Sequence, residues 1–174
     1  VSMTGNNMDE TWIRPGLFVG LHQLLVLDSS GNHIARLEQG LVDELTALQV
    51  LHLGHNKIHT IATHSFRHLA NLHILTLEHN QLETVQRQTL AGLSLLNTLN
   101  LDANKLHTLH AGSLKNCTAL ASLGLSHNFL TLVAAENYDV KTTLWMSSEE
   151  MAGGDPPKRR RKRKKKVTCP NKAL

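Results

Sequence analysis

The chain has 174 residues, is 41% hydrophobic and only 3% aromatic, and carries a formal net charge of +4. This composition is sufficient for the core of one ordinary domain, while two cysteines, Cys117 and Cys169, exclude a disulfide framework. No stretch approaches the roughly 18 apolar residues that span a bilayer. Because the chain begins at Val1 with no secretory apolar segment, we expect a mature or truncated chain without signal peptide or transmembrane helix.

The positive charge is confined to the C-terminus. Residues 1–135 carry a net charge of −2, residues 136–157 carry −4, and residues 158–174 carry +10. Any function that depends on basic charge therefore belongs to the last segment and not to the body of the chain.

A 24-residue repeat organises the chain. Its unit reads LxxLxLxxNxL, and the most regular leucine column is Leu27, Leu51, Leu75, Leu99 and Leu123. The asparagine column is Asn32, Asn56, Asn80, Asn104 and Asn128. An irregular copy, two residues longer, precedes the five regular ones. Five copies in register predict a solenoid in which each copy buries its apolar face against its neighbours.

This unit resembles the leucine-rich repeat, which implies an α/β horseshoe with short parallel strands on its concave face. The leucines of each LxL point inward because side chains alternate along a strand. The asparagine is expected to turn inward and to bond backbone groups of the turns above and below it.

The repeat has two defects. Ser29 stands where the column has leucine, and after Val133 the pattern fails, since Ser147 and Glu149 occupy positions expected to be apolar. The predicted organisation is repeats in 1–133, a linker in 134–157 and a disordered polybasic tail in 158–174. Neither end shows a cysteine-rich cap, so an internal slice of a longer array is the natural interpretation.

The non-leucine strand positions are predicted to form a polar, protein-binding concave face, although a merely solvated face is the alternative. The candidate binding residues are Asp28, Ser30, His52, His55, Thr76, Glu78, His79, Asn100, Asp102, Ser126 and His127. His55 and His79 lie on adjacent rungs, roughly 5 Å apart, close enough to share a metal or to repel when protonated. No third ligand is fixed by the spacing, so surface polar residues are the favoured interpretation, and no metal or other cofactor is predicted.

Two residues of one motif have separate predicted roles. Asn116-Cys117-Thr118 is an N-glycosylation sequon, with Asn116 expected on the outside of the solenoid. Cys117 replaces leucine in a buried column and is expected to be a small core residue. No catalytic motif is present, which predicts a protein that is not an enzyme and has no small-molecule substrate.

The tail contains nine consecutive basic residues: Lys158, Arg159, Arg160, Arg161, Lys162, Arg163, Lys164, Lys165 and Lys166. Such a block is expected to be disordered and to bind nucleic acid, heparin-like polymers or anionic lipid, or to direct nuclear import. The alternative is a non-functional extension from an alternative or mispredicted exon, since the sequence pattern changes abruptly.

Two segments carry a more specific resemblance. GNNMDETWIRPGLFVGLHQLLVLD (residues 5–28) and LKNCTALASLGLSHNFL (residues 114–130) are similar to stretches in ectodomains of arthropod Toll-type receptors. The resemblance implies a cell-surface receptor segment, on the extracellular side, that binds a cystine-knot cytokine-like ligand or another receptor ectodomain, dimerises, and takes part in signalling in immunity or development. Other extracellular adhesive repeat proteins, or a nuclear repeat adaptor using the tail, are the alternatives.

Overall fold

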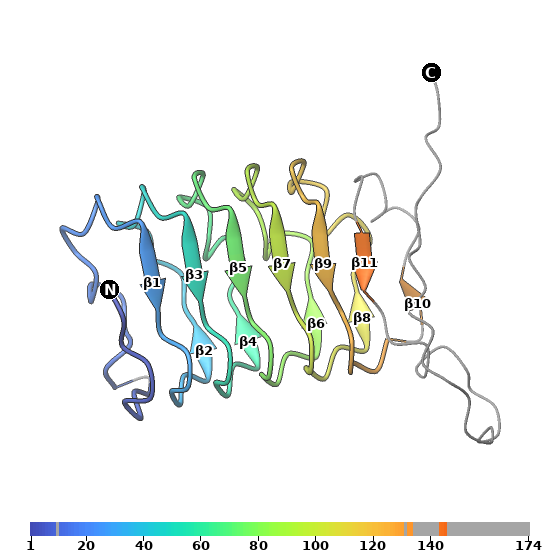
Figure 1. Cartoon of the computed structure of the whole chain (residues 1–174), viewed down its shortest axis with the longest axis horizontal. Helices are drawn as coiled ribbons and strands as arrows, with labels where there is room; N and C mark the ends of the chain where they lie inside the picture. Colours follow the sequence, from blue (N-terminus) through green and yellow to red (C-terminus); the bar gives the residue numbers. More distant parts are fainter. Residues whose placement is uncertain (10, 131, 134–142, 146–174) are drawn as a thin grey trace.

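The computed structural model describes residues 1–9, 11–130, 132–133 and 143–145, and shows a solenoid of stacked turns (Figure 1). One side of the solenoid is a six-stranded parallel sheet in the order β1-β3-β5-β7-β9-β11. Its strands are β1 (Val26–Asp28), β3 (Val50–His52), β5 (Ile74–Thr76), β7 (Thr98–Asn100), β9 (Ser122–Gly124) and β11 (Thr143–Trp145). The predicted leucine-rich-repeat solenoid with parallel strands is confirmed.

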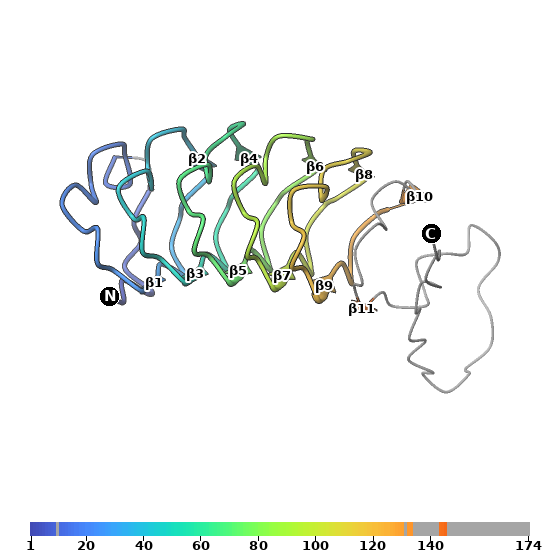
Figure 2. The ribbon, with the colours of Figure 1, turned by 90° about the horizontal axis from the view of Figure 1, so that it is seen from above.

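The opposite side carries shorter strands (Figure 2). They form a two-stranded sheet and a three-stranded sheet, both parallel, made of β2 (Arg36–Leu37), β4 (Thr60–Ile61), β6 (Thr84–Val85), β8 (Thr108–Leu109) and β10 (Leu132–Val133). Turns connect the two sides, and the described residues contain no helix, so the helical part of the predicted class is not seen there. No described segment is therefore a helix long and apolar enough to cross a bilayer.

The register of the large sheet follows the repeat. Val26 pairs with Val50, Val50 with Ile74, and each later rung to β9 adds another 24 residues. The expectation that the ordered repeats end at Val133 needs correction, because Leu144 of β11 pairs with Leu123 of β9. This rung is 21 residues long instead of 24, so a search at the fixed period placed the strand positions three residues too late and assigned all of 134–157 to a linker.

The core is one continuous stack of leucines between the two sides. Leu51, Leu75 and Leu99 of the sheet are fully buried, and Phe66, Leu90 and Leu114 close the opposite half of their turns. The irregular first copy adds a further rung, since Ser2 bridges to Asp28 and the Met3 amide donates to the Asp28 carbonyl at 2.7 Å. Burial of aliphatic side chains along the whole stack is therefore the main stabilising contribution.

The asparagine column forms a buried ladder of hydrogen bonds. Asn80 Nδ2 donates to the carbonyls of Leu53 and Leu77, both at 3.0 Å, and Asn80 Oδ1 accepts from the Ile58 amide at 2.9 Å. Equivalent bonds are made by the other members, which are Asn32, Asn56, Asn104 and Asn128. From Asn32 to Asn104 these bonds reach the residue's own turn and the preceding turn, so the expected bond to the following turn is wrong.

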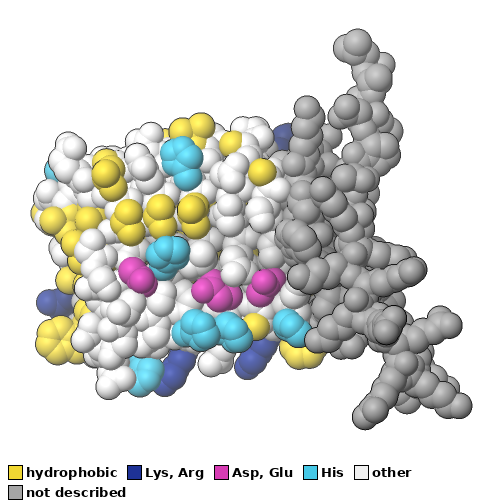
Figure 3. Space-filling view, in the orientation of Figure 1, with side chains coloured by type: hydrophobic (Ala, Val, Ile, Leu, Met, Phe, Trp, Pro, Cys, Tyr) yellow, Lys and Arg dark blue, Asp and Glu magenta, His cyan; other side chains and the backbone are white. Residues whose placement is uncertain are grey.

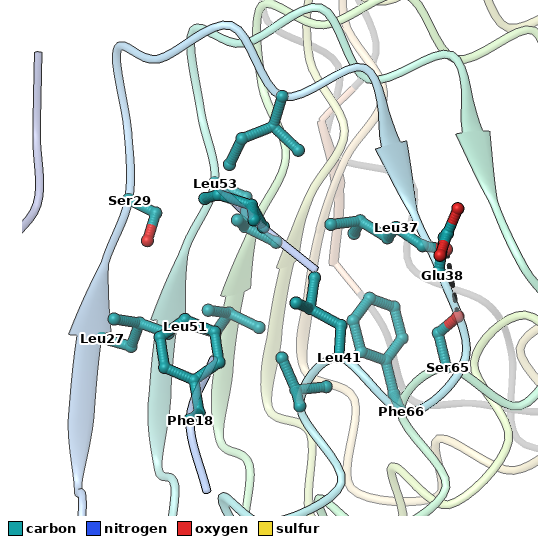
Figure 4. Close-up of a pocket in the computed structure, with 13 residues that line it drawn as sticks. Phe18, Leu27, Ser29, Leu37, Glu38, Leu41, Leu51, Leu53, Ser65 and Phe66 are labelled. Atoms are coloured by element: carbon teal, nitrogen blue, oxygen red, sulfur yellow. Dashed lines mark hydrogen bonds between the residues drawn. The ribbon is translucent and has the colours of Figure 1, made fainter. Parts of the chain in front are cut away.

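A small cavity marks the defect at Ser29. The side chain is buried, its hydroxyl has no hydrogen-bond partner, and it lies on the sheet side of a cavity of about 20 Å³ (Figure 4). Leu53 lies beside it, and Phe66 closes the opposite wall. The missing leucine therefore leaves a local packing fault and an unsatisfied hydroxyl, both of which are unfavourable.

Candidate protein-binding face

The outer face of the six-stranded sheet, which we call the sheet face, collects every residue predicted for the concave face. Successive side chains of a strand point to opposite sides, so with Leu27, Leu51 and Leu75 buried, their neighbours in the strands point outward. The parallel register then aligns equivalent residues into three columns across the strands, which are Asp28, His52, Thr76, Asn100 and Gly124; Ser30, Gly54, Glu78, Asp102 and Ser126; and Gly31, His55, His79, Ala103 and His127. Asp28, Ser30, His52, Thr76, Glu78, Asn100, Asp102 and Ser126 are half-buried there, and His55, His79 and His127 are exposed.

A fourth column on this face was missed by the sequence interpretation, which described the face as polar. It consists of Val26, Val50, Ile74, Thr98 and Ser122. Its first three members are aliphatic, Val26 is 44% exposed, and apolar side chains form a row across β1, β3 and β5 (Figure 3). The signal was present in the sequence, because this position shares its side of the strand with Asp28 and its equivalents.

Two carboxylates of the sheet face lie against glycines of neighbouring turns. A Cβ atom at Gly54 would overlap Oε1 of Glu78, and one at Gly124 would lie 2.8 Å from Oδ1 of Asp102. Glu78 Oε2 is buried and has no hydrogen-bond partner. Asp102 Oδ1 accepts a hydrogen bond of 2.7 Å from the Ser126 amide.

Burial raises the pKa of Asp102 above its ordinary value, and the nearby negative charge of Glu78 acts in the same direction. The Ser126 hydrogen bond and the neighbouring His127 and His79 oppose this rise. The sheet face thus holds two carboxylates that are partly withdrawn from water. Few hydrogen bonds from the protein replace the lost contacts with water.

Histidines form the edge of the face beside the asparagine ladder. His55 and His79 stack with ring centroids 4.4 Å apart and an interplanar angle of 14°. Both have a positive φ, 55° and 52°, at the position where the first regular copy has Gly31. This left-handed conformation is uncommon for residues other than glycine, so the turn imposes backbone strain. His52 Nδ1 lies 3.0 Å from Thr76 Oγ1 on the next strand.

Metal binding gains no support from these rings. The described residues contain no group of three or more His, Cys, Asp or Glu side chains arranged to hold a metal ion. The stacked pair offers flat ring surfaces and polar nitrogens at this edge of the sheet face.

The sequon lies away from the sheet face. Asn116 is exposed, while the adjacent Cys117 is fully buried and is a free thiol whose pKa is raised to about 12 by burial. The Thr118 hydroxyl donates to the Ser94 carbonyl at 3.3 Å. Glycosylation of Asn116 remains a prediction, as does the role of Lys158–Lys166, which lies outside the described residues.

The stacked turns, the leucine core and the exposed columns define a repeat solenoid, a class that typically serves as a non-enzymatic scaffold for binding proteins. The sequence profile of the family described as Leucine rich repeat matches residues 30–82 and 70–130. The chain belongs to this leucine-rich-repeat family. Comparison with curated proteins gives no match.

Proposed function

We propose that the chain is a non-enzymatic protein-binding module that engages its partner through the sheet face. The observation that carries the proposal is the alignment of four columns over the five rungs from β1 to β9 without a break in register. Leucine packing below and the asparagine ladder beside them hold these columns in place. A rigid surface loses little conformational entropy on association, which favours affinity for a partner.

We further propose that this module is a segment of a Toll-like cell-surface receptor ectodomain, acting in ligand recognition and signal transduction outside the cell. The resemblance of residues 5–28 and 114–130 supports this assignment. The exposed position of Asn116 is compatible with a glycan that leaves the sheet face open. The partner is then a cystine-knot cytokine-like protein or another receptor ectodomain, with dimerisation as the step that transmits the signal.

A matched pair of substitutions tests the binding face. Thr98 lies on the sheet face in β7, and Thr108 lies in β8 on the opposite side of the same turn. Thr98→Arg is expected to weaken binding of a purified cystine-knot ligand by at least about tenfold, because a long charged side chain then stands in the contact area. Thr108→Arg is expected to leave the affinity unchanged. If Thr108→Arg weakens binding and Thr98→Arg does not, the partner does not bind at the sheet face.

The parent transcript tests the receptor assignment. Sequence that continues the repeats into a membrane helix and a cytoplasmic TIR domain supports a Toll-like receptor, whereas adhesive or matrix-type flanking domains support another extracellular repeat protein.

A nuclear or intracellular adaptor is a second candidate, favoured by the basic run Lys158–Lys166. It is tested by the location of the tagged chain with and without this run. Nuclear accumulation that depends on the run supports the adaptor, whereas a glycan on Asn116 places the chain in the secretory pathway and excludes it.

A further inference from the structure

We infer that the sheet face recognises an extended polypeptide segment in which apolar and basic side chains alternate. This inference rests on the proposed function as a protein-binding module and specifies the chemistry of its partner. It follows from three features of the face: its charge, its incompletely compensated carboxylates and its apolar row.

The sheet face has negative charge and no cation of its own. Its four columns from β1 to β9 contain Asp28, Glu78 and Asp102, and none of the seven Lys and Arg residues of 1–135 stands in them. Figure 3 shows the acidic side chains as a band below the apolar row, with Lys and Arg toward the margins of the view. In the described residues, ion pairs join Asp43 to Arg67 and His68, and Glu44 to His22, but none involves the carboxylates of the sheet face.

The carboxylates of Glu78 and Asp102 are prepared for a cationic partner. Part of their hydration is already lost in the free protein, since Glu78 Oε2 is buried without a hydrogen bond and Asp102 is half-buried. The two negative charges also act unfavourably on each other. A Lys or Arg side chain brought by a partner places a positive charge beside the two half-buried carboxylates and relieves this repulsion, so the partner meets a smaller desolvation cost than at a fully hydrated carboxylate.

The apolar row gives the partner a second point of attachment. Val26, Val50 and Ile74 run across the strands, parallel to the acidic band and separated from it by two to four residues along each strand, about 7–13 Å. The five rungs from β1 to β9 span about 19 Å, which an extended peptide of six to eight residues covers. Its side chains alternate in direction, so one set lies over the aliphatic row and the other reaches the carboxylates.

The test uses the full chain and fluorescently labelled peptides of eight residues. The first probe alternates Val and Lys, the second alternates Ser and Lys with the same charge, and the third alternates Val and Glu. Anisotropy titrations at physiological salt are expected to give the tightest binding for the Val-Lys peptide. Equal binding of the Ser-Lys peptide contradicts the apolar contribution, and equal binding of the Val-Glu peptide contradicts the charge complementarity.

Variants locate the binding on the face. The double variant Glu78→Gln/Asp102→Asn is expected to weaken the Val-Lys peptide by at least about tenfold, and Ile74→Ser by several-fold. The matched control is Glu38→Gln/Glu83→Gln, which removes two exposed carboxylates outside the sheet face and is expected to change the affinity less than about twofold. An equal loss in the control shows a general charge effect and overturns the proposal.

The chain's own basic run is a competing occupant. If binding of the Val-Lys peptide appears only after Lys158–Lys166 are replaced by Ser, the tail occupies the face and a separate partner is not its ligand. If no peptide binds in either chain while Thr98→Arg still weakens a protein ligand, the inferred partner chemistry is wrong and the proposed function stands. If substitutions on the sheet face change the binding of neither peptides nor protein ligands, both the proposed function and the inferred partner chemistry are wrong.

Discussion

Glu78 lies against the backbone of Gly54 on the preceding rung, so closely that a Cβ atom at position 54 would overlap Oε1 of the carboxylate. The contact joins two members of one column, and the small residue on one rung makes room for the large one on the next. A related contact occurs at Gly124, where a Cβ atom would lie 2.7 Å from Oδ1 of Asn100 in the same column and 2.8 Å from Oδ1 of Asp102 in the neighbouring column. These glycines shape the acidic part of the sheet face without any need for unusual backbone angles.

Substitution of Gly54 is therefore predicted to move a side chain and leave the fold intact. Gly54→Ala displaces the flexible end of Glu78 toward water, and we expect a change in the free energy of unfolding below about 1 kcal/mol. Gly92→Ala is the comparison, because its Cβ would lie 2.6 Å from the Arg67 carbonyl and its φ is +95°. We expect the Gly92 variant to lose about 2 kcal/mol or more in urea unfolding. Similar losses for both variants contradict this account.

The asparagine ladder is predicted to be a major source of stability. Asn80→Ala leaves the buried amide of Ile58 without its bond and removes one of the two side-chain bonds accepted by each of the carbonyls of Leu53 and Leu77, which keep Asn56 and Asn104 as donors. With about 1–3 kcal/mol for the unsatisfied amide and about 0.5–1.5 kcal/mol for each of the two lost carbonyl bonds, we expect a loss of at least about 2 kcal/mol in urea unfolding. Asn71→Ala is the control, since exposed Asn71 makes one bond to the Thr46 carbonyl and its loss should cost under about 1 kcal/mol. Equal costs refute the ladder's role.

Most of the fold was predictable because each 24-residue repeat of the sequence forms one turn of the solenoid. Leu51, Leu75 and Leu99 recur every 24 residues and become one buried column, so a pattern in one dimension fixes the register of the sheet. The rung at β11 was missed because a 21-residue turn breaks the period while the backbone still pairs Leu144 with Leu123. A comparison at a fixed period does not detect a strand that is displaced by three residues along the sequence.

The candidate site was predictable in its columns and less so in its chemistry. Alternation placed Asp28 and His52 on the outer face, and the same rule applied one position earlier would have revealed Val26 and Val50. The burial of Glu78 Oε2 was not predictable, because it depends on the side chain turning toward Gly54 on another rung. Such contacts follow from rotamers and neighbouring volumes, which a repeat pattern does not contain.

The defect at Ser29 predicts an easily stabilised protein. Ser29→Leu fills the adjoining cavity and removes the unpaired hydroxyl, and we expect a gain of about 1–3 kcal/mol in the free energy of unfolding. Ser29→Ala removes the hydroxyl alone and should gain about 1 kcal/mol or less. Ser65 lines the same cavity but donates to the Ala62 carbonyl at 2.8 Å, so Ser65→Ala should be destabilising. A destabilised Ser29→Leu variant shows that the cavity cannot accept the larger side chain.

The buried thiol is predicted to be unreactive in the folded chain. Burial raises the pKa of Cys117 to about 12, so the thiolate fraction at pH 8 is about one in ten thousand, and access is closed as well. In a Cys169→Ser background, where Cys117 is the only thiol, we expect a disulfide reagent to react only as urea unfolds the protein. Rapid modification without denaturant contradicts the burial of this column.

Asp102 gives the stability of the protein a predicted pH dependence. Its pKa in the folded state is raised above the ordinary value of 3.8, chiefly by burial, so ionisation costs the folded state more than the unfolded one. The stability linked to this group is present below pH 3.8 and is lost as the pH rises through the raised pKa. Asp102→Asn should therefore be more stable at pH 7, by less than about 1 kcal/mol because water still reaches the carboxylate.

Asp9 is expected to show the opposite pH dependence. Its pKa is lowered, chiefly by the hydrogen bond from the Thr11 side chain, so its contribution to the stability of the folded state rises with pH. Thermal unfolding between pH 3 and pH 7 should show that the difference between Asp102→Asn and the unmodified chain grows with pH, whereas Asp9→Asn loses stability relative to that chain. Binding of a basic peptide should weaken with acidification over the Asp102 range, because protonation removes the charge that attracts it. A stability difference for Asp102→Asn that shrinks with rising pH contradicts the raised pKa.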